Sequence, residues 1–108
     1  MINICFKQSS SKILGFNIEG HAEYGEEGED IVCSAVSALS YTIVNGITEV
    51  LKISVEHIIK DGFLQLSLRD NNLEEIEKCQ VLLETMLLGF KSMEIGYGDY
   101  IKVQVEEV

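Results

Sequence analysis

An uncharged run of 18 residues, 31–48, is the feature that most restricts how this chain can fold. Apolar residues recur there at steps of three and four, which predicts a helix with one face against a core. The stripe comprises Val32, Val36, Leu39, Ile43, Ile47 and Val50. The run approaches membrane-spanning length, but hydroxyl and amide side chains interrupt it and acidic residues precede it. We therefore expect a buried helix, not a membrane span, with Gly46 loosening or shortening its end.

Strands are predicted on both sides of this helix, because apolar and polar residues alternate there with a period of two. Residues 2–6 and 14–18 are expected to pair as a hairpin. The dipeptide Asp61-Gly62 lies between two apolar runs, which indicates a second hairpin with strands near residues 54–60 and 63–68. A last strand is expected around residues 101–105, where apolar residues alternate again.

A second helix is predicted between the second hairpin and the last strand. Asn72 followed by Glu75 resembles a capping box, and Gly96 and Gly98 mark a turn after the helix. The apolar stripe of this helix consists of Ile76, Cys79, Leu83, Leu87 and Phe90. The order is ββαββαβ, and the predicted fold class is α+β. We expect residues 1–108 to form a single two-layer domain, a mixed or antiparallel sheet covered mainly on one face by two helices.

The formal net charge of −10 narrows the choice of partners. It disfavours nucleic acid and anionic membranes, whose phosphates would repel this surface. Solubility alone explains such a charge, although a basic partner is also allowed. The first residues lack a basic segment followed by an apolar one, so we expect a cytoplasmic protein.

The three cysteines, Cys5, Cys33 and Cys79, are odd in number and widely spaced, which predicts free thiols. We expect no metal and no cofactor. His57 is predicted to be a strand residue, while Cys5 and Cys79 are predicted to be packing residues. The acidic residues Glu23, Glu26, Glu27 and Glu29 lack the Asp-x-Asp-x-Asp-Gly order of a calcium loop and are interpreted as part of a solvated loop.

His21 and Cys33 are joined by residues 19–30, a glycine-containing segment with six acidic residues in twelve. If Asp30 is the N-cap, Cys33 is the third helical residue, where unpaired amides and the helix dipole lower the pKa of a thiol. A nearby imidazole can take the thiol proton and then stabilise the thiolate. The pattern alone leaves open a catalytic pair, or a buried cysteine and an unrelated turn histidine.

Two motifs in this segment resemble the ribosomal-processing cysteine protease family. They are Gly20-His21-Ala22 and Gly28-Glu29-Asp30-Ile31-Val32-Cys33. The resemblance implies that Cys33 is the nucleophile and His21 its general base and acid. Its supporting or substrate-binding positions are Gly20, Asp30, Ser34 and Ser37.

The roles of these supporting residues stay open. Asp30 caps the helix alone or also positions the loop. Ser37 hydrogen-bonds near the thiol or bonds back to the preceding turn. Ser34 stands where the family is expected to have alanine, a mild change.

The resemblance also implies an activity. A protein of this kind is an endopeptidase that removes the N-terminal extension of one large-subunit ribosomal protein during ribosome assembly, cutting after a hydrophobic, aromatic-rich sequence. It is expected to be a homodimer. The alternative is a non-catalytic acidic module that binds a basic ribosomal or assembly protein, with Cys33 merely buried.

Overall fold

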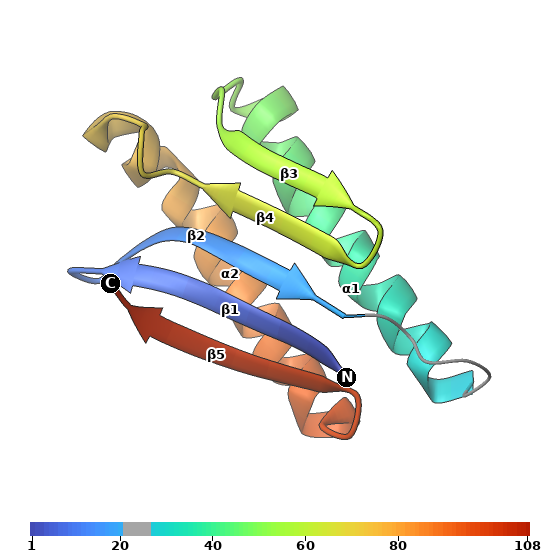
Figure 1. Ribbon diagram of the computed structural model, residues 1–108. Helices are drawn as coiled ribbons and strands as arrows, with labels where there is room; N and C mark the ends of the chain where they lie inside the picture. Colours follow the sequence, from blue (N-terminus) through green and yellow to red (C-terminus); the bar gives the residue numbers. More distant parts are fainter. Residues whose placement is uncertain (21–26) are drawn as a thin grey trace.

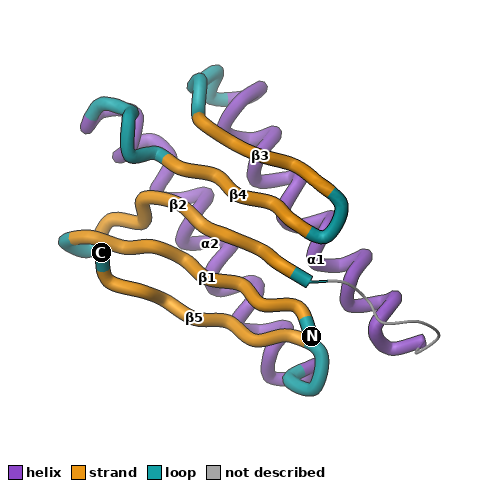
Figure 2. The backbone as a smooth tube through the Cα atoms, viewed as in Figure 1, coloured by secondary structure: helices purple, strands orange, loops and turns teal. Residues whose placement is uncertain are grey.

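Two helices cover one face of a five-stranded sheet (Figure 1). The computed structural model describes residues 1–20 and 27–108. The elements are β1 (Ile2–Ser9), β2 (Lys12–Glu19), α1 (Glu27–Asn45), a π-helical turn (Gly46–Val50), β3 (Glu56–Lys60), β4 (Phe63–Ser67), α2 (Leu73–Tyr97) and β5 (Ile101–Glu107). The predicted order ββαββαβ and the α+β class are confirmed. The helices lie side by side on the same side of the sheet (Figure 2).

The sheet is mixed, with the strand order β3-β4-β2-β1-β5. β1 and β2 form the predicted antiparallel hairpin, in which Phe6 pairs with Phe16. β4 is antiparallel to both β2 and β3, and β5 is parallel to β1. β3 begins at Glu56, slightly later than predicted, and β4 ends at Ser67. β3 and β5 are therefore the two edge strands.

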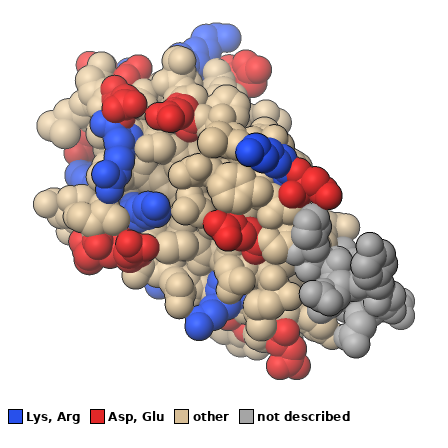
Figure 3. All heavy atoms as spheres, viewed as in Figure 1, with Lys and Arg blue, Asp and Glu red and all other residues tan. Residues whose placement is uncertain are grey.

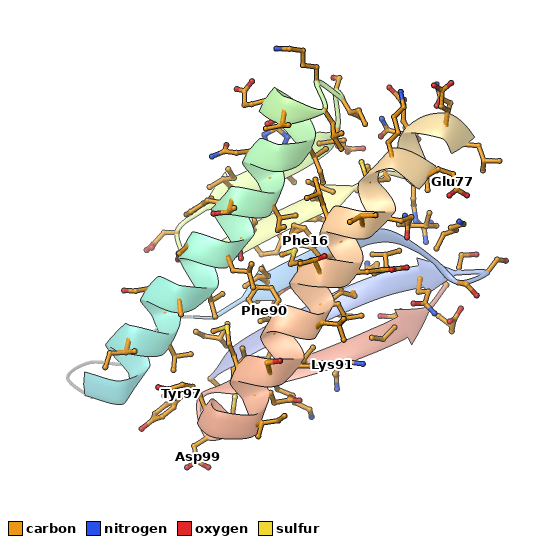
Figure 4. All side chains as sticks on the ribbon, turned by 180° about the vertical axis from the view of Figure 1, so that it is seen from behind. Phe16, Glu77, Phe90, Lys91, Tyr97 and Asp99 are labelled. Atoms are coloured by element: carbon orange, nitrogen blue, oxygen red, sulfur yellow. The ribbon has the colours of Figure 1, made fainter. Side chains whose placement is uncertain are left out.

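The core lies between the sheet and the helices. The ring centroids of Phe6 and Phe16 are 5.8 Å apart, and those of Phe6 and Phe90 are 6.3 Å apart, with tilted planes that aromatic pairs favour. Figure 4 shows Phe90 of α2 and Phe16 of β2 in the layer between the helices and the sheet. The predicted stripe of α2 is confirmed as its inner face, with Leu83 and Phe90 fully buried.

The capping box at the start of α2 is also confirmed. The Glu75 amide donates a hydrogen bond to the Asn72 side chain at 2.9 Å, and the Asn72 amide donates one to the Glu75 carboxylate at 3.4 Å. The helix runs to Tyr97, so Gly96 lies within it and only Gly98 marks its end.

The first helix follows the predicted stripe until its last turn. Val32, Val36, Ile43 and Ile47 are buried, but Val50 is 77% exposed, so that prediction was wrong. The reason is the π-helical turn at Gly46, where the Leu51 amide donates a hydrogen bond to the Gly46 carbonyl at 2.9 Å. Because this turn is wider than an α-helical one, it shifts the phase of the stripe. Gly46 does disturb the end of the helix, as expected.

The segment Ile31–Val50 is long and apolar enough to cross a membrane by length and composition alone. In this fold its buried side chains belong to the single core cluster beneath the sheet. About 33% of the segment is buried, and a helix that packs one face on a sheet can meet the same criteria of length and composition as a membrane span.

A buried glutamine joins α2 to the central hairpin. Gln80 is 7% exposed, and its side chain accepts a hydrogen bond from the Ile13 amide at 2.8 Å and donates one to the Ile13 carbonyl at 2.9 Å. Ile13 is paired with Gln8, where the register of β1 and β2 shifts. Such an irregularity leaves backbone groups without ladder partners. The Gln80 amide supplies those partners and fixes α2 against β2.

Replacing Gln80 with methionine tests this contact. Methionine keeps most of the volume but leaves the Ile13 amide and carbonyl buried without partners, so we expect a loss of about 1–3 kcal/mol in the free energy of unfolding. Urea denaturation measures it. Glu84→Met, at an exposed position of the same helix, is the control and should change stability by less than about 0.5 kcal/mol. Equal stability of Gln80→Met and the unmodified protein would contradict this role.

The end of β2 is held by a glycine. Gly20 has a φ of +124°, and its amide donates a hydrogen bond to the Gly62 carbonyl at 3.0 Å. A Cβ atom built on Gly20 would lie 2.3 Å from the Met1 carbonyl oxygen. Glycine is therefore required twice, by the backbone conformation and by the close approach of the residue before β1.

A pair of glycine-to-alanine variants separates this requirement from the general effect of adding a methyl group. Gly20→Ala should lower the free energy of unfolding by about 1–3 kcal/mol or more, because of strain and the clash with Met1. Gly96→Ala lies in α2 with open space around the added Cβ, so it should raise stability by up to about 1 kcal/mol. Thermal and urea unfolding of both variants check the opposite signs; equal signs would contradict the interpretation.

Candidate active site

A small pocket of about 80 Å³ lies between α1 and the ends of the neighbouring strands. α1 contributes a row of side chains to it: Cys33, Val36, Ser37, Ser40 and Tyr41. From the sheet it is lined by Gly20 after β2, Lys60 at the end of β3, Gly62 in the turn that follows and Phe63 at the start of β4. Rigid elements therefore hold most of the wall of this pocket.

Three of the predicted site residues meet in the pocket, namely Gly20, Cys33 and Ser37. Ser34 is exposed on α1 and is not among the lining residues. His21 lies outside the described residues, as does the Asp30 side chain, so their predicted roles stay predictions. Glu23 and Glu26 of the acidic segment also lie outside them.

The predicted start of α1 was wrong. The helix begins at Glu27, so Asp30 is inside it and is not its N-cap, and Cys33 lies in the second turn. Only the first four amides of a helix lack partners within it, so the helix end does not supply free amides at Cys33. Acidic residues are favourable near the start of a helix, and the sequence has glutamate at positions 27 and 29.

The thiol of Cys33 is partly exposed in the pocket, unlike that of Cys79. Cys79 is fully buried, and burial and then the charge of Glu75 raise the pKa of its thiol. At Cys5, burial and then a hydrogen bond of 3.6 Å to Glu106 raise the pKa of the thiol. All three cysteines are free, as predicted. The two cysteines outside the pocket are thus held in the neutral form, which is a poor nucleophile.

The serines of α1 differ in their surroundings. Ser40 is buried, and its hydroxyl donates to the Val36 carbonyl one turn earlier at 2.6 Å. That bond occupies the only proton of the hydroxyl. Ser37 is exposed at the pocket, one turn from Cys33, and is the better placed of the two to meet a ligand.

Sequence reasoning missed Tyr41 and Lys60. Tyr41 is 45% exposed, two turns beyond Cys33, and Lys60 is the one cation among the described lining residues. The Asp61-Gly62 signal located the turn beside Lys60, but no local pattern indicates that this turn packs near α1. The pairing of these two elements is visible only in the folded chain.

His57 and the acidic side chains were the other candidates for a functional site. His57 is an exposed residue of β3, as predicted, and its Nδ1 atom lies 3.1 Å from the Val55 carbonyl oxygen. In the described part of the chain, no group of three or more histidine, cysteine or acidic side chains is arranged to hold a metal. Figure 3 shows lysine and arginine atoms interspersed with acidic ones on the visible face, so the acidity forms no single patch there.

Comparisons with known proteins agree with this geometry. The family model "Cysteine protease Prp" matches residues 1–102. The ribosomal processing cysteine protease Prp of Bacillus subtilis (strain 168) is 28% identical over 109 aligned positions, covering 95% of this chain and 96% of its own. Two crystal structures of the ribosomal processing protease Prp from S. aureus also match. The complex with a covalently linked product peptide has a TM-score of 0.83 and 28% identity. The complex with a substrate peptide has a TM-score of 0.85 and 25% identity.

The match to each of these crystal structures covers 98% of this chain and 100% of the chain in the crystal. The likeness therefore extends over the whole fold and is not confined to one motif. A match of this extent sets aside the alternative of a non-catalytic binding module. The chain belongs to the Prp family of ribosomal-processing cysteine proteases.

Proposed function

We propose that this chain removes the N-terminal extension of a large-subunit ribosomal protein, with Cys33 as the nucleophile and His21 as the general base and acid. One observation carries the assignment of the pair: Gly20, the residue that precedes His21, lines the same pocket as Cys33. The names of the relatives and the peptide complexes of the S. aureus protease support the class of substrate.

The reaction follows from the chemistry of these two groups. His21 takes the thiol proton, and the Cys33 sulfur attacks the carbonyl carbon of the peptide bond. The C–N bond breaks as His21 returns the proton to the leaving amine, which leaves an acyl-enzyme thioester. Water then attacks the thioester, releasing the new carboxylate and regenerating the thiol. The chain's own groups are sufficient for each proton transfer.

The charge of the chain suits the proposed substrate. Ribosomal proteins are basic, and a net charge of −10 attracts a basic partner over distances of about 10 Å at moderate salt. This attraction acts on the rate of encounter more than on the final affinity. It therefore complements the recognition of the segment that is cut and does not replace it.

Mutation of the proposed pair tests the assignment. A peptide that copies the extension through the cleaved bond should be cut by the unmodified protein, as measured by mass spectrometry. Cys33→Ala should abolish cleavage, and His21→Ala should lower kcat/KM by about 100-fold or more, the usual contribution of a general base. Cys5→Ala is the matched cysteine control and should retain activity. Undiminished cleavage by Cys33→Ala would contradict the proposal.

We also propose that the protein is a cytoplasmic homodimer. A row of exposed apolar residues on α2 favours association: Val81, Leu88 and Ile95 are 74%, 64% and 89% exposed. They recur every seven residues, so they share one side of the helix. Exposed apolar side chains that share one side of a helix often mark an interface between proteins.

Sedimentation velocity at micromolar concentration tests the dimer. We expect a dimer for the unmodified chain and a monomer for Leu88→Glu, because a charge buried in an apolar interface is costly. Asn45→Glu, at an exposed position of α1, is the control and should remain dimeric. A monomeric unmodified chain would contradict the proposal.

A further inference from the structure

Among the described residues, β3 is an edge strand of the sheet, and it lies next to the candidate active site. It is the outermost strand on its side of the sheet, and all five of its residues are exposed. Its centre is apolar, since Ile58 and Ile59 are 40% and 49% exposed, and charges stand only at its ends, Glu56 and Lys60. Edge strands with an apolar centre are templates for pairing with another extended segment.

The register of the β3–β4 hairpin shows which backbone groups face outward. Lys60 pairs with Phe63 across the two-residue turn, so this pair closes the hairpin with hydrogen bonds. Hydrogen-bonded and non-hydrogen-bonded residue pairs alternate along an antiparallel pair of strands. Ile59, opposite Leu64, and His57, opposite Leu66, therefore point their amides and carbonyls away from the sheet. Two residues, spaced as an added strand requires, offer hydrogen bonds at this edge.

The same edge leads into the pocket. Lys60 ends β3 and lines the pocket together with Cys33 and Tyr41. Cys33 and Tyr41 are eight positions apart, which corresponds to about 12 Å along α1. An extended peptide covers about that distance with three or four residues. A peptide bound along β3 thus reaches Cys33 within a few residues of leaving the strand.

The opposite edge has no such continuity. No residue of β5 is among those that line the pocket. The exposed residues of β5 include Lys102, Glu106 and Glu107, so its edge is more highly charged than that of β3. Charged edges oppose pairing with an apolar segment.

We infer that the apolar segment of the substrate upstream of the cleaved bond adds to the sheet as a sixth strand along β3. The identity of this occupant rests on the proposed function. β3 runs toward the pocket, and the upstream segment also runs toward the cleaved bond, so the added strand is parallel to β3. Backbone hydrogen bonds from His57 and Ile59 hold the peptide, and side chains on its two faces meet Ile58 on one side and Ile59 on the other.

Single N-methylation of the peptide tests this arrangement without altering the protein. Each peptide in a series carries one N-methyl group, at the third to the seventh residue upstream of the cleaved bond. Binding to Cys33→Ala is measured by fluorescence anisotropy, so that no peptide is consumed. In a strand pairing, alternate amides face the partner. We therefore expect Kd to rise at least 10-fold at alternate positions, where methylation removes one hydrogen bond to β3. At the positions between them, Kd should rise less than about 3-fold.

A variant of β3 supplies the matching test from the side of the protein. Ile59→Pro removes the outward amide but no bond to β4, and proline is tolerated on edge strands. Circular dichroism should show a folded protein, and Kd for the unmethylated peptide should rise at least 10-fold. Ile59→Val keeps the amide and trims only the side chain, so it should raise Kd by less than Ile59→Pro does. If Ile59→Pro does not fold, the peptide series decides alone.

The outcomes separate this inference from the proposed function. Alternating penalties in Kd support the added strand even if the unmodified protein does not cut the unmethylated peptide, a result that would remove only the proposed cleavage. Uniform penalties, absent penalties or no binding would overturn the inference. A further result would overturn it as well: the peptide series shows no alternation, and Ile59→Pro converts a dimer to a monomer. The occupant of the edge would then be a second copy of the chain.

Discussion

The close approach of three strand ends around one glycine is the constraint on which the candidate site depends. The Gly20 amide bonds to the Gly62 carbonyl, and the space where its Cβ would stand is taken by the Met1 carbonyl. The ends of β1, β2 and the β3–β4 turn therefore converge at a fixed point, opposite the second turn of α1. Cys33 shares its pocket with Gly20 and Gly62, whose backbones are hydrogen-bonded to each other. A site built on such elements keeps its geometry better than one built on loops alone.

Local signals in the sequence were sufficient for most of the fold. Alternation identified the strands, Asp61-Gly62 the second hairpin, and Asn72 with Glu75 the start of α2, because each signal depends on contacts between residues close in sequence. The parallel pairing of β5 with β1 has no such signal, since it joins the two ends of the chain. The exposure of Val50 also has no signal in the sequence, because a π-helical turn changes the phase of an apolar stripe without changing its composition.

The site was predictable only in part, for related reasons. Motifs singled out His21 and Cys33, and the structure brings Gly20, Cys33 and Ser37 together. Tyr41 and Lys60 were missed because they meet the pocket through packing between elements distant in sequence. The N-cap was misplaced because Asp30 is a good cap by residue type, whereas Glu27 and Glu29 are favourable near the start of a helix. When several acidic residues precede an apolar run, residue type alone does not fix the helix start.

The position of the helix start determines which groups are close enough to stabilise the sulfur of Cys33. With Cys33 in the second turn, unpaired amides at the helix end do not reach it, and an anionic sulfur must draw its stabilisation from positive charge in the pocket. The chain as a whole opposes that anion, with a net charge of −10. Lys60 is the described lining residue with positive charge, and an imidazolium at His21 is the other proposed source. A substrate strand along β3 would cover the end of that strand and exclude water beside Lys60. Electrostatic attraction strengthens when water is excluded, so a bound peptide would strengthen the field of the Lys60 charge within the pocket.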